Sequence, residues 1–175
     1  MLTIGDPFPH FYLRAVVSCE PGKESATISN ETYRGKWQVV FFYPKDATSI
    51  CASEVIAFGQ AGKDFESRGA QLLSVSLDSV DVHLAWRKQP ELANLSFPMI
   101  SDNRHELSDA LGILAKDQRV ALRATFIVDP RGIIRHVSVN EVMIGRNTDE
   151  VLRILDALQT GGPTLCNWHR GTPTP

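Results

Sequence analysis

The fold and the chemistry of this chain are decided by residues 37–54, Trp37-Gln-Val-Val-Phe-Phe-Tyr-Pro-Lys-Asp-Ala-Thr-Ser-Ile-Cys-Ala-Ser-Glu54. The first seven residues form an apolar run rich in β-branched and aromatic side chains, which predicts a buried strand over residues 37–43. Pro44 ends that strand because it cannot donate a backbone hydrogen bond. A helix is expected over residues 51–67, since Val55, Phe58 and Phe65 share one helical face.

Cys51 therefore stands on the first turn of the expected helix. The sulfur lies near unpaired backbone N–H groups at the positive end of the helix dipole, and both favour the reactive thiolate. A cysteine in an apolar stretch is most often small core filler, so this position alone does not decide its role. We interpret Cys51 as a thiol used for chemistry because of the residues that accompany it.

Strand and helix patterns alternate along the rest of the chain. Asp129-Pro130-Arg131-Gly132 supplies a turn between two strands, which predicts a terminal hairpin. Polar residues 18–35 are expected to form a surface connection. The β-α-β alternation predicts an α/β fold of the thioredoxin-like class, with a central mixed sheet flanked by helices. Further strands are expected over 71–77, 97–101, 125–128 and 133–139, and helices over 80–88, 106–111 and 149–159.

The domain organisation follows from a change in the sequence pattern at residue 161. Residues 1–160, including an N-terminal extension, are expected to form one domain, which suits a chain of 175 residues. Gly161-Gly162-Pro163 ends the last helix, and residues 161–175 have no hydrophobic period. They are expected to form a C-terminal tail that is mobile unless it docks on the domain.

Composition excludes several classes of function. A net charge of −2 provides no basic field for nucleic acid or an anionic membrane. No apolar run approaches the roughly 20 residues that cross a bilayer, and no secretory signal is visible, so a cytoplasmic location is expected. The three cysteines and five histidines lack metal-ligand spacing, and no Cys-x-x-Cys pair exists. A metal site is therefore not expected.

The accompanying residues suit the reduction of a peroxide by a thiol. Thr48 can present a hydroxyl to a bound oxygen, and Pro44 offers a rigid apolar wall. Arg123 lies close to the strand expected over 125–128, near an end of the sheet, where it can place a permanent charge beside the sulfur of Cys51. Cys166 on the tail can condense with a sulfenic acid to give a disulfide, which prevents irreversible oxidation.

At this point a family resemblance is plain. Pro44-x-x-x-Thr48-x-x-Cys51, Arg123 and the tail Cys166-Asn167-Trp168 resemble the typical two-cysteine peroxiredoxins. The similarity is greatest to the C-subunit type of alkyl hydroperoxide reductase found in actinobacteria. It covers nearly the whole chain, including the stretches 2–6, 35–37, 83–86, 97–99, 125–130 and 145–150.

The resemblance implies a role for each of these residues. Cys51 would be the peroxidatic cysteine, and Cys166 the resolving cysteine, supplied by the other subunit of a homodimer. Thr48 and Arg123 would bind and polarise the peroxide, while Pro44 would shield the nascent sulfenate. Glu54 and Arg146 match the family's ion pair that holds the arginine in place.

The resemblance also implies substrates and partners. Members reduce hydrogen peroxide and alkyl hydroperoxides in antioxidant defence, without a metal, haem or flavin of their own. They draw electrons from a flavoprotein disulfide reductase, a thioredoxin or a small dithiol adaptor protein. Their dimers often join into decamer or dodecamer rings. The alternatives within the same fold are an oligomeric holdase chaperone and a peroxide sensor.

The sequence departs from the family pattern in the active-site loop and beyond it. The family's usual aromatic residues are absent at Ala47 and Ser49, and its proline is absent at Ala52. Because the loop at Ala47 borders the contact between dimers in this family, ring assembly stays open, as does any role of Cys19. The Gly-Gly-Leu-Gly loop and terminal Tyr-Phe of oxidation-sensitive members are also absent, which predicts resistance to overoxidation.

A disulfide requires Cα atoms about 4.4–6.8 Å apart. A thiol in a folded helical turn is not expected to lie that close to a tail thiol. We therefore expect the first turn around Cys51 and the tail around Cys166 to loosen in each catalytic cycle.

Overall fold

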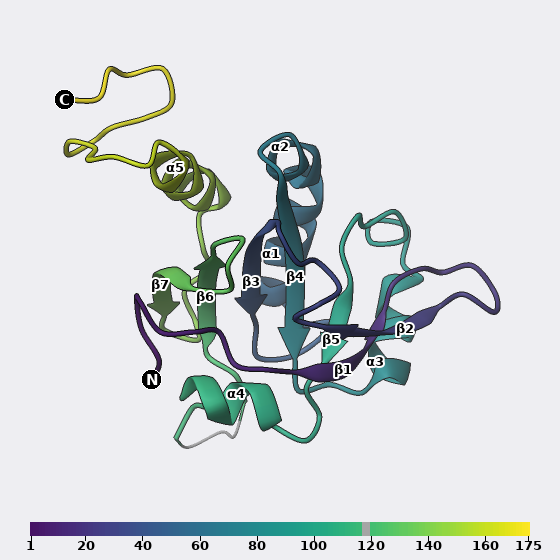
Figure 1. The fold of residues 1–175 in the computed structure, drawn as a ribbon. Coiled ribbons are helices and arrows are strands. Elements are labelled where there is room, and N and C mark those ends of the chain that lie inside the picture. The colour runs from purple at the N-terminus through teal and green to yellow at the C-terminus, as the bar shows by residue number, and fades with distance from the viewer. Residues whose placement is uncertain (117–119) are drawn as a thin grey trace.

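The computed structural model describes residues 1–116 and 120–175. Within them, one mixed sheet has the strand order β2-β1-β5-β4-β3-β6-β7 (Figure 1). β3, β4 and β5 run parallel, whereas β6 is antiparallel to β3 and β7 is antiparallel to β6. The expected mixed α/β sheet is confirmed. The strands are β1 Tyr12–Val16, β2 Ser25–Ser29, β3 Trp37–Phe42, β4 Ala70–Ser76, β5 Met99–Ser101, β6 Arg123–Val128 and β7 Ile134–Asn140.

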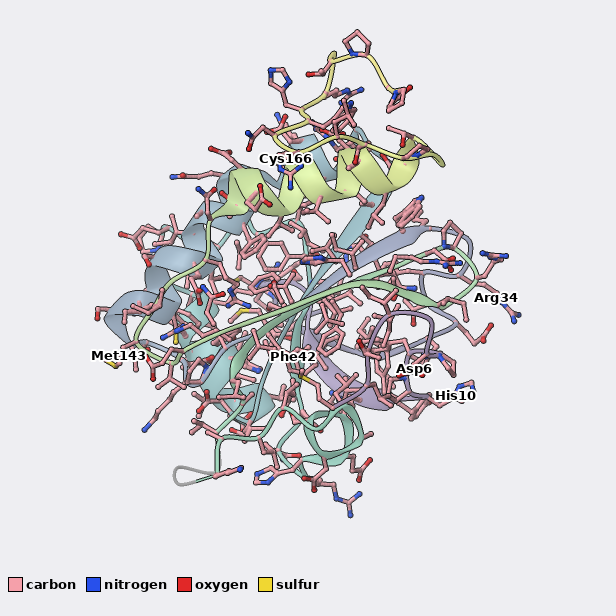
Figure 2. All side chains as sticks on the ribbon, turned by 90° about the vertical axis from the view of Figure 1, so that its left-hand side faces the viewer. Asp6, His10, Arg34, Phe42, Met143 and Cys166 are labelled. Carbon is pink, nitrogen blue, oxygen red and sulfur yellow. The ribbon has the colours of Figure 1, made fainter. Side chains whose placement is uncertain are left out.

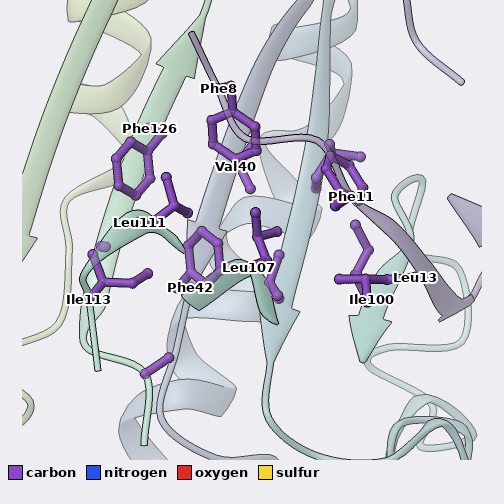
Figure 3. Packing of buried hydrophobic residues seen from close by; sticks show 14 of the residues in the cluster. Phe8, Phe11, Leu13, Val40, Phe42, Ile100, Leu107, Leu111, Ile113 and Phe126 are labelled. Carbon is purple, nitrogen blue, oxygen red and sulfur yellow. The ribbon is translucent and has the colours of Figure 1, made fainter. Parts of the chain in front are cut away.

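Helices cover both faces of the sheet, and β3 divides its side chains between them. Val40 and Phe42 belong to a core cluster that includes residues of α4 and of the N-terminal segment (Figure 3). Val39 and Phe41 belong to a second cluster with residues of α1, α3 and α5. Successive side chains of a strand point to opposite faces, so a continuous apolar run such as β3 serves both clusters. The helices are α1 Ser49–Gln60, α2 Gly62–Glu66, α3 Val80–Arg87, α4 Glu106–Leu111 and α5 Thr148–Gln159.

The single helix expected over residues 51–67 is wrong in its bounds. The chain forms two helices instead, α1 and α2, which meet at Ala61. Gly62 packs so closely on the chain at Ser96 that a Cβ atom at this position would lie 2.6 Å from the Ser96 hydroxyl. Glycine is a poor helix former, and the break coincides with this close approach. α1 also begins earlier than expected, at Ser49.

The prediction that residues 18–35 form only a surface connection is wrong as well. They include β2, a strand that was not predicted from the sequence. It pairs antiparallel with β1. In β2 only Ile28 is fully buried, opposite Leu13 of β1. A short, polar edge strand lacks the hydrophobic pattern by which strands are predicted, because its stability depends on its pairing partner.

The tail after α5 forms no helix or strand, but part of it lies against the domain. Trp168 is only 5% exposed, and Arg153 of α5 donates a hydrogen bond to its carbonyl at 3.0 Å. Cys166, two residues earlier, is exposed on this tail beside α5 (Figure 2). The division into a domain of residues 1–160 and a mobile tail stays a prediction. Among the described residues, no helix has both the length and the apolar character needed to traverse a bilayer.

Candidate active site

Cys51 is the third residue of α1, within its first turn. Thr48 precedes the helix with extended backbone angles, and its carbonyl accepts the first helical hydrogen bond from Ala52 at 2.8 Å. The strand, the proline and the helix start thus place the cysteine where backbone N–H groups have no helical partner. Cys51 is 0% exposed and packs in the second core cluster. The favourable helix terminus is therefore combined with exclusion of bulk water.

Arg123 lies directly at this sulfur. It is the first residue of β6, which pairs with β3, and its Nη1 lies 3.3 Å from Cys51 Sγ. Its Nε donates to the carbonyl of Val142 at 2.7 Å, so the guanidinium is held from two sides. The side chain is 3% exposed. A permanent cation at this distance in a dry site favours a negatively charged sulfur and stabilises developing negative charge on a bound oxygen.

Glu54 lies on the same helix, three residues after Cys51, and its side chain is 2% exposed. It accepts hydrogen bonds from Arg123 Nη1 at 2.7 Å and from Arg146 Nε and Nη2 at 2.9 and 2.7 Å. One carboxylate is thus shared by two guanidinium groups. The cluster keeps one uncompensated positive charge for the sulfur, while the carboxylate stabilises the two buried arginines.

Arg146 lies in the connection between β7 and α5, and further contacts with β6, β3 and α1 hold its side chain in place. Its Nη1 donates to the carbonyl of Ala124 at 3.0 Å. Its guanidinium carbon lies 5.4 Å from the ring centroid of Phe41 and 5.8 Å from that of Phe58. These aromatic faces attract the cation and restrict its movement. Arg146 therefore supports Glu54 without contacting the sulfur.

Thr48 and Pro44 lie in the loop that precedes Cys51. The hydroxyl of Thr48 donates to the carbonyl of Lys45 at 3.1 Å, and the residue is exposed. Pro44 is half-buried between the end of β3 and the start of the loop.

The structure of the single chain does not bring Cys166 to Cys51. Cys166 is an exposed, free thiol that lines a surface pocket with Arg153 and Glu150. Cys51, in contrast, is a residue of α1 and is buried in the second core cluster. Cys19 is a third free thiol, half-buried, with its sulfur 3.5 Å from the carbonyl of Arg87. It does not contact the Cys51 cluster in the described part of the chain.

A second polar cluster adjoins the site and was missed at the sequence level. Asp46, in the loop before Cys51, contacts both Tyr43 and His83. The histidines lack metal-ligand spacing in the sequence, but His83 is fully buried in this cluster. The spacing of His83 and Trp86, three residues apart on a helix, is the signal that both face the core. In residues 1–116 and 120–175, no three His, Cys, Asp or Glu side chains are grouped to bind a metal ion.

Comparison with known proteins agrees with this geometry. The sequence model of the AhpC/TSA family matches residues 4–137. Alkyl hydroperoxide reductase C of Mycolicibacterium smegmatis is 48% identical, over 99% of this chain and 93% of that protein. The structure of Mycobacterium tuberculosis AhpC superposes with a TM-score of 0.87, at 47% identity, over 97% of this chain and 99% of that one. Reduced Plasmodium vivax 2-Cys peroxiredoxin gives 0.89 at 35% identity, with 97% and 91% covered.

Proposed function

The chain belongs to the AhpC/TSA family and is a thiol-dependent peroxidase, and on this premise we propose that Cys51 attacks the peroxide and Cys166 resolves the product. The observation that carries the first assignment is the contact of 3.3 Å between Arg123 and the buried sulfur of Cys51. Among the three cysteines, only Cys51 combines a helix N-terminus with a guanidinium group at its sulfur.

The first step is a transfer of one oxygen atom. The Cys51 thiolate attacks the nearer oxygen of the peroxide, the O–O bond breaks, and the departing oxygen takes up a proton to leave as water or an alcohol. Cys51 becomes a sulfenic acid. Arg123 stabilises the negative charge that develops on the departing oxygen. Thr48 and Pro44 supply a hydrogen-bonding hydroxyl and an apolar wall on the loop, while Glu54 and Arg146 position Arg123.

The second step forms a disulfide. The Cys166 thiol attacks the sulfur of the sulfenic acid, and water leaves. A reductant protein, either a flavoprotein disulfide reductase, a thioredoxin or a small dithiol adaptor, then returns two electrons and two protons. Such turnover suits the reducing cytoplasm, where thiols are kept available. Hydrogen peroxide and alkyl hydroperoxides are the substrate class.

Resolution requires movement and a second subunit. Cys51 has no exposed surface, and a disulfide needs Cα atoms about 4.4–6.8 Å apart. The first turn of α1 therefore opens before the bond forms, and the tail thiol comes from the partner of a homodimer. β7 is an edge of the sheet, and Met143 and Ile144 just beyond it are exposed, which supports pairing at this edge. Assembly of dimers into decamer or dodecamer rings is the further part of the proposal.

Rapid mixing of the reduced protein with peroxide tests these assignments. We expect wild type to consume peroxide and to form a covalent dimer on a non-reducing gel. Cys166→Ser should reduce one equivalent and then stall, because its sulfenic acid has no partner thiol. Cys51→Ser should not react. Continuous turnover by Cys166→Ser with a dithiol reductant protein, at the wild-type rate, would remove Cys166 from the mechanism.

A further inference from the structure

A buried polar cluster adjoins the loop that carries Cys51, and the reaction proposed above makes no use of it. Asp46 is its centre. Tyr43 donates its hydroxyl to Asp46 Oδ1 at 2.9 Å, and His83 Nδ1 lies 2.6 Å from Asp46 Oδ2. The backbone N–H of Asp46 donates to the carboxylate of Asp78 at 2.8 Å. Tyr43 and His83 are 0% exposed and Asp46 is 5% exposed, so these contacts are shielded from water.

His83 is held at both of its ring nitrogens. His83 Nε2 lies 3.2 Å from the carbonyl oxygen of Ile100, so each ring nitrogen faces an oxygen acceptor. The imidazole ring thus joins the Asp46 carboxylate to the backbone of β5. Burial, and then the neighbouring Asp46, raise the pKa of Tyr43 well above its usual range, so its hydroxyl stays a donor. Asp46 is thereby bound to the end of β3, to α3 and to the β4–α3 connection.

Immediately after Asp46, the chain takes a strained conformation. Ala47 has φ +57°, in the left-handed region that L-residues with a Cβ atom adopt at a cost. Its neighbour on the other side is Thr48, the N-cap of α1. The strained residue thus lies between a fixed point at Asp46 and the first turn of the helix. Such strain persists only where the surroundings hold it in place.

We propose that Asp46 and His83 form a clamp, which holds the Cys51 turn closed against the strain at Ala47 and so sets how oxidised Cys51 divides between disulfide and sulfinic acid. This inference rests on the peroxidase chemistry and the turn opening proposed above. His83 acts here as a positioning residue, through Asp46 and the loop, and touches neither peroxide nor sulfur.

The division follows from a competition between two reactions of the sulfenic acid. When the turn is open, Cys166 attacks it and water leaves. When the turn stays closed, a second peroxide transfers an oxygen atom to the sulfur, giving the sulfinic acid and a further molecule of water or alcohol. A stronger clamp increases the lifetime of the closed state and so favours the second reaction. A weaker clamp favours the disulfide.

Two variants should move this division in opposite directions. His83→Gln removes the imidazole ring that joins Asp46 to the carbonyl of Ile100, so the peroxide concentration that converts half of Cys51 to sulfinate should rise on the order of tenfold. Ala47→Gly relieves the strain at φ +57° and stabilises the closed turn, so that concentration should fall by about fivefold. Mass spectrometry of Cys51 after graded peroxide doses measures both. Rapid-mixing fluorescence measures the rate of disulfide formation, which should change in the same sense as the half-conversion concentration.

The controls separate a clamp from a merely structural role. His10→Gln replaces an exposed histidine and should leave the division unchanged. If His83 had a merely structural role, His83→Gln would lower the melting temperature without changing the ratio of disulfide to sulfinic acid at Cys51. The clamp is refuted if both folded variants stay within twofold of wild type or shift in the same direction. Should His83→Gln fail to fold, Ala47→Gly at its exposed site decides alone. If wild-type Cys51 is not oxidised at all, the proposed function fails instead.

Discussion

Replacing Arg123 by alanine should lower the second-order rate constant for peroxide by about 10²–10³-fold. The guanidinium group lies 3.3 Å from Cys51 Sγ, and it is one of two arginines that share the single carboxylate of Glu54, so the cluster has a net positive charge. Without it, both the thiolate and the departing oxygen lose their closest cation. Glu54 keeps Arg146 as a partner, so the variant should still fold. Rapid mixing with hydrogen peroxide, followed by tryptophan fluorescence, measures the rate constant.

Arg153→Ala is the matched control for this experiment. Arg153 is also an arginine paired with a glutamate, but its partner Glu150 is half-exposed, and the pair lies on α5. We expect its rate constant to stay within about threefold of wild type. The same pair of variants separates the peroxidase from a holdase chaperone, whose capture of unfolded protein would not need Arg123. A rate for folded Arg123→Ala equal to that of wild type would contradict the role assigned to its charge.

Glu54→Gln should lower the free energy of unfolding by about 3–5 kcal/mol. The substitution keeps the shape of the side chain but leaves two guanidinium groups, each 3% exposed, without a negative partner. Buried charges that lose their partner carry most of this cost. Urea denaturation of the reduced protein, read by circular dichroism, measures the change.

The control is Glu150→Gln, which breaks an ion pair of the same type where the glutamate side chain is 54% exposed. Solvent screens that pair, so we expect a change of about 0–1 kcal/mol. Equal effects for the two glutamate variants would show that the Glu54 cluster contributes no more than a surface pair. Glu54→Gln should also react more slowly with peroxide, because Arg123 loses the carboxylate that positions it.

Local sequence patterns predicted the part of the molecule in which neighbours along the chain decide the structure. The apolar run of residues 37–43, Pro44 and the helical period after Cys51 gave the strand, the break and the buried thiol on the first turn. The place of Arg123 near the start of a strand indicated an end of the sheet. Its partners Glu54 and Arg146 followed only from the family resemblance, because their contacts join segments 69 and 92 residues apart.

Features that depend on tertiary contacts were not predictable in this way. The polar strand β2 is stabilised by pairing with β1, and the junction of α1 and α2 coincides with the close approach of Gly62 to Ser96. The direction of the Thr48 hydroxyl depends on one carbonyl of the folded loop. His83 carries no local signal for its pairing with Asp46, 37 residues earlier, although its spacing from Trp86 indicated a buried face.

The most direct measurement locates the first sulfur atom that peroxide oxidises. In the Cys166→Ser variant the sulfenic acid should persist long enough to be trapped by a 1,3-dione reagent after a single equivalent of peroxide. Peptide mass spectrometry should find the label on Cys51 alone, in nearly every chain. Labelling of Cys19 with Cys51 unmodified would contradict the account, because a thiol that does not lie at a helix N-terminus would then be the reactive one.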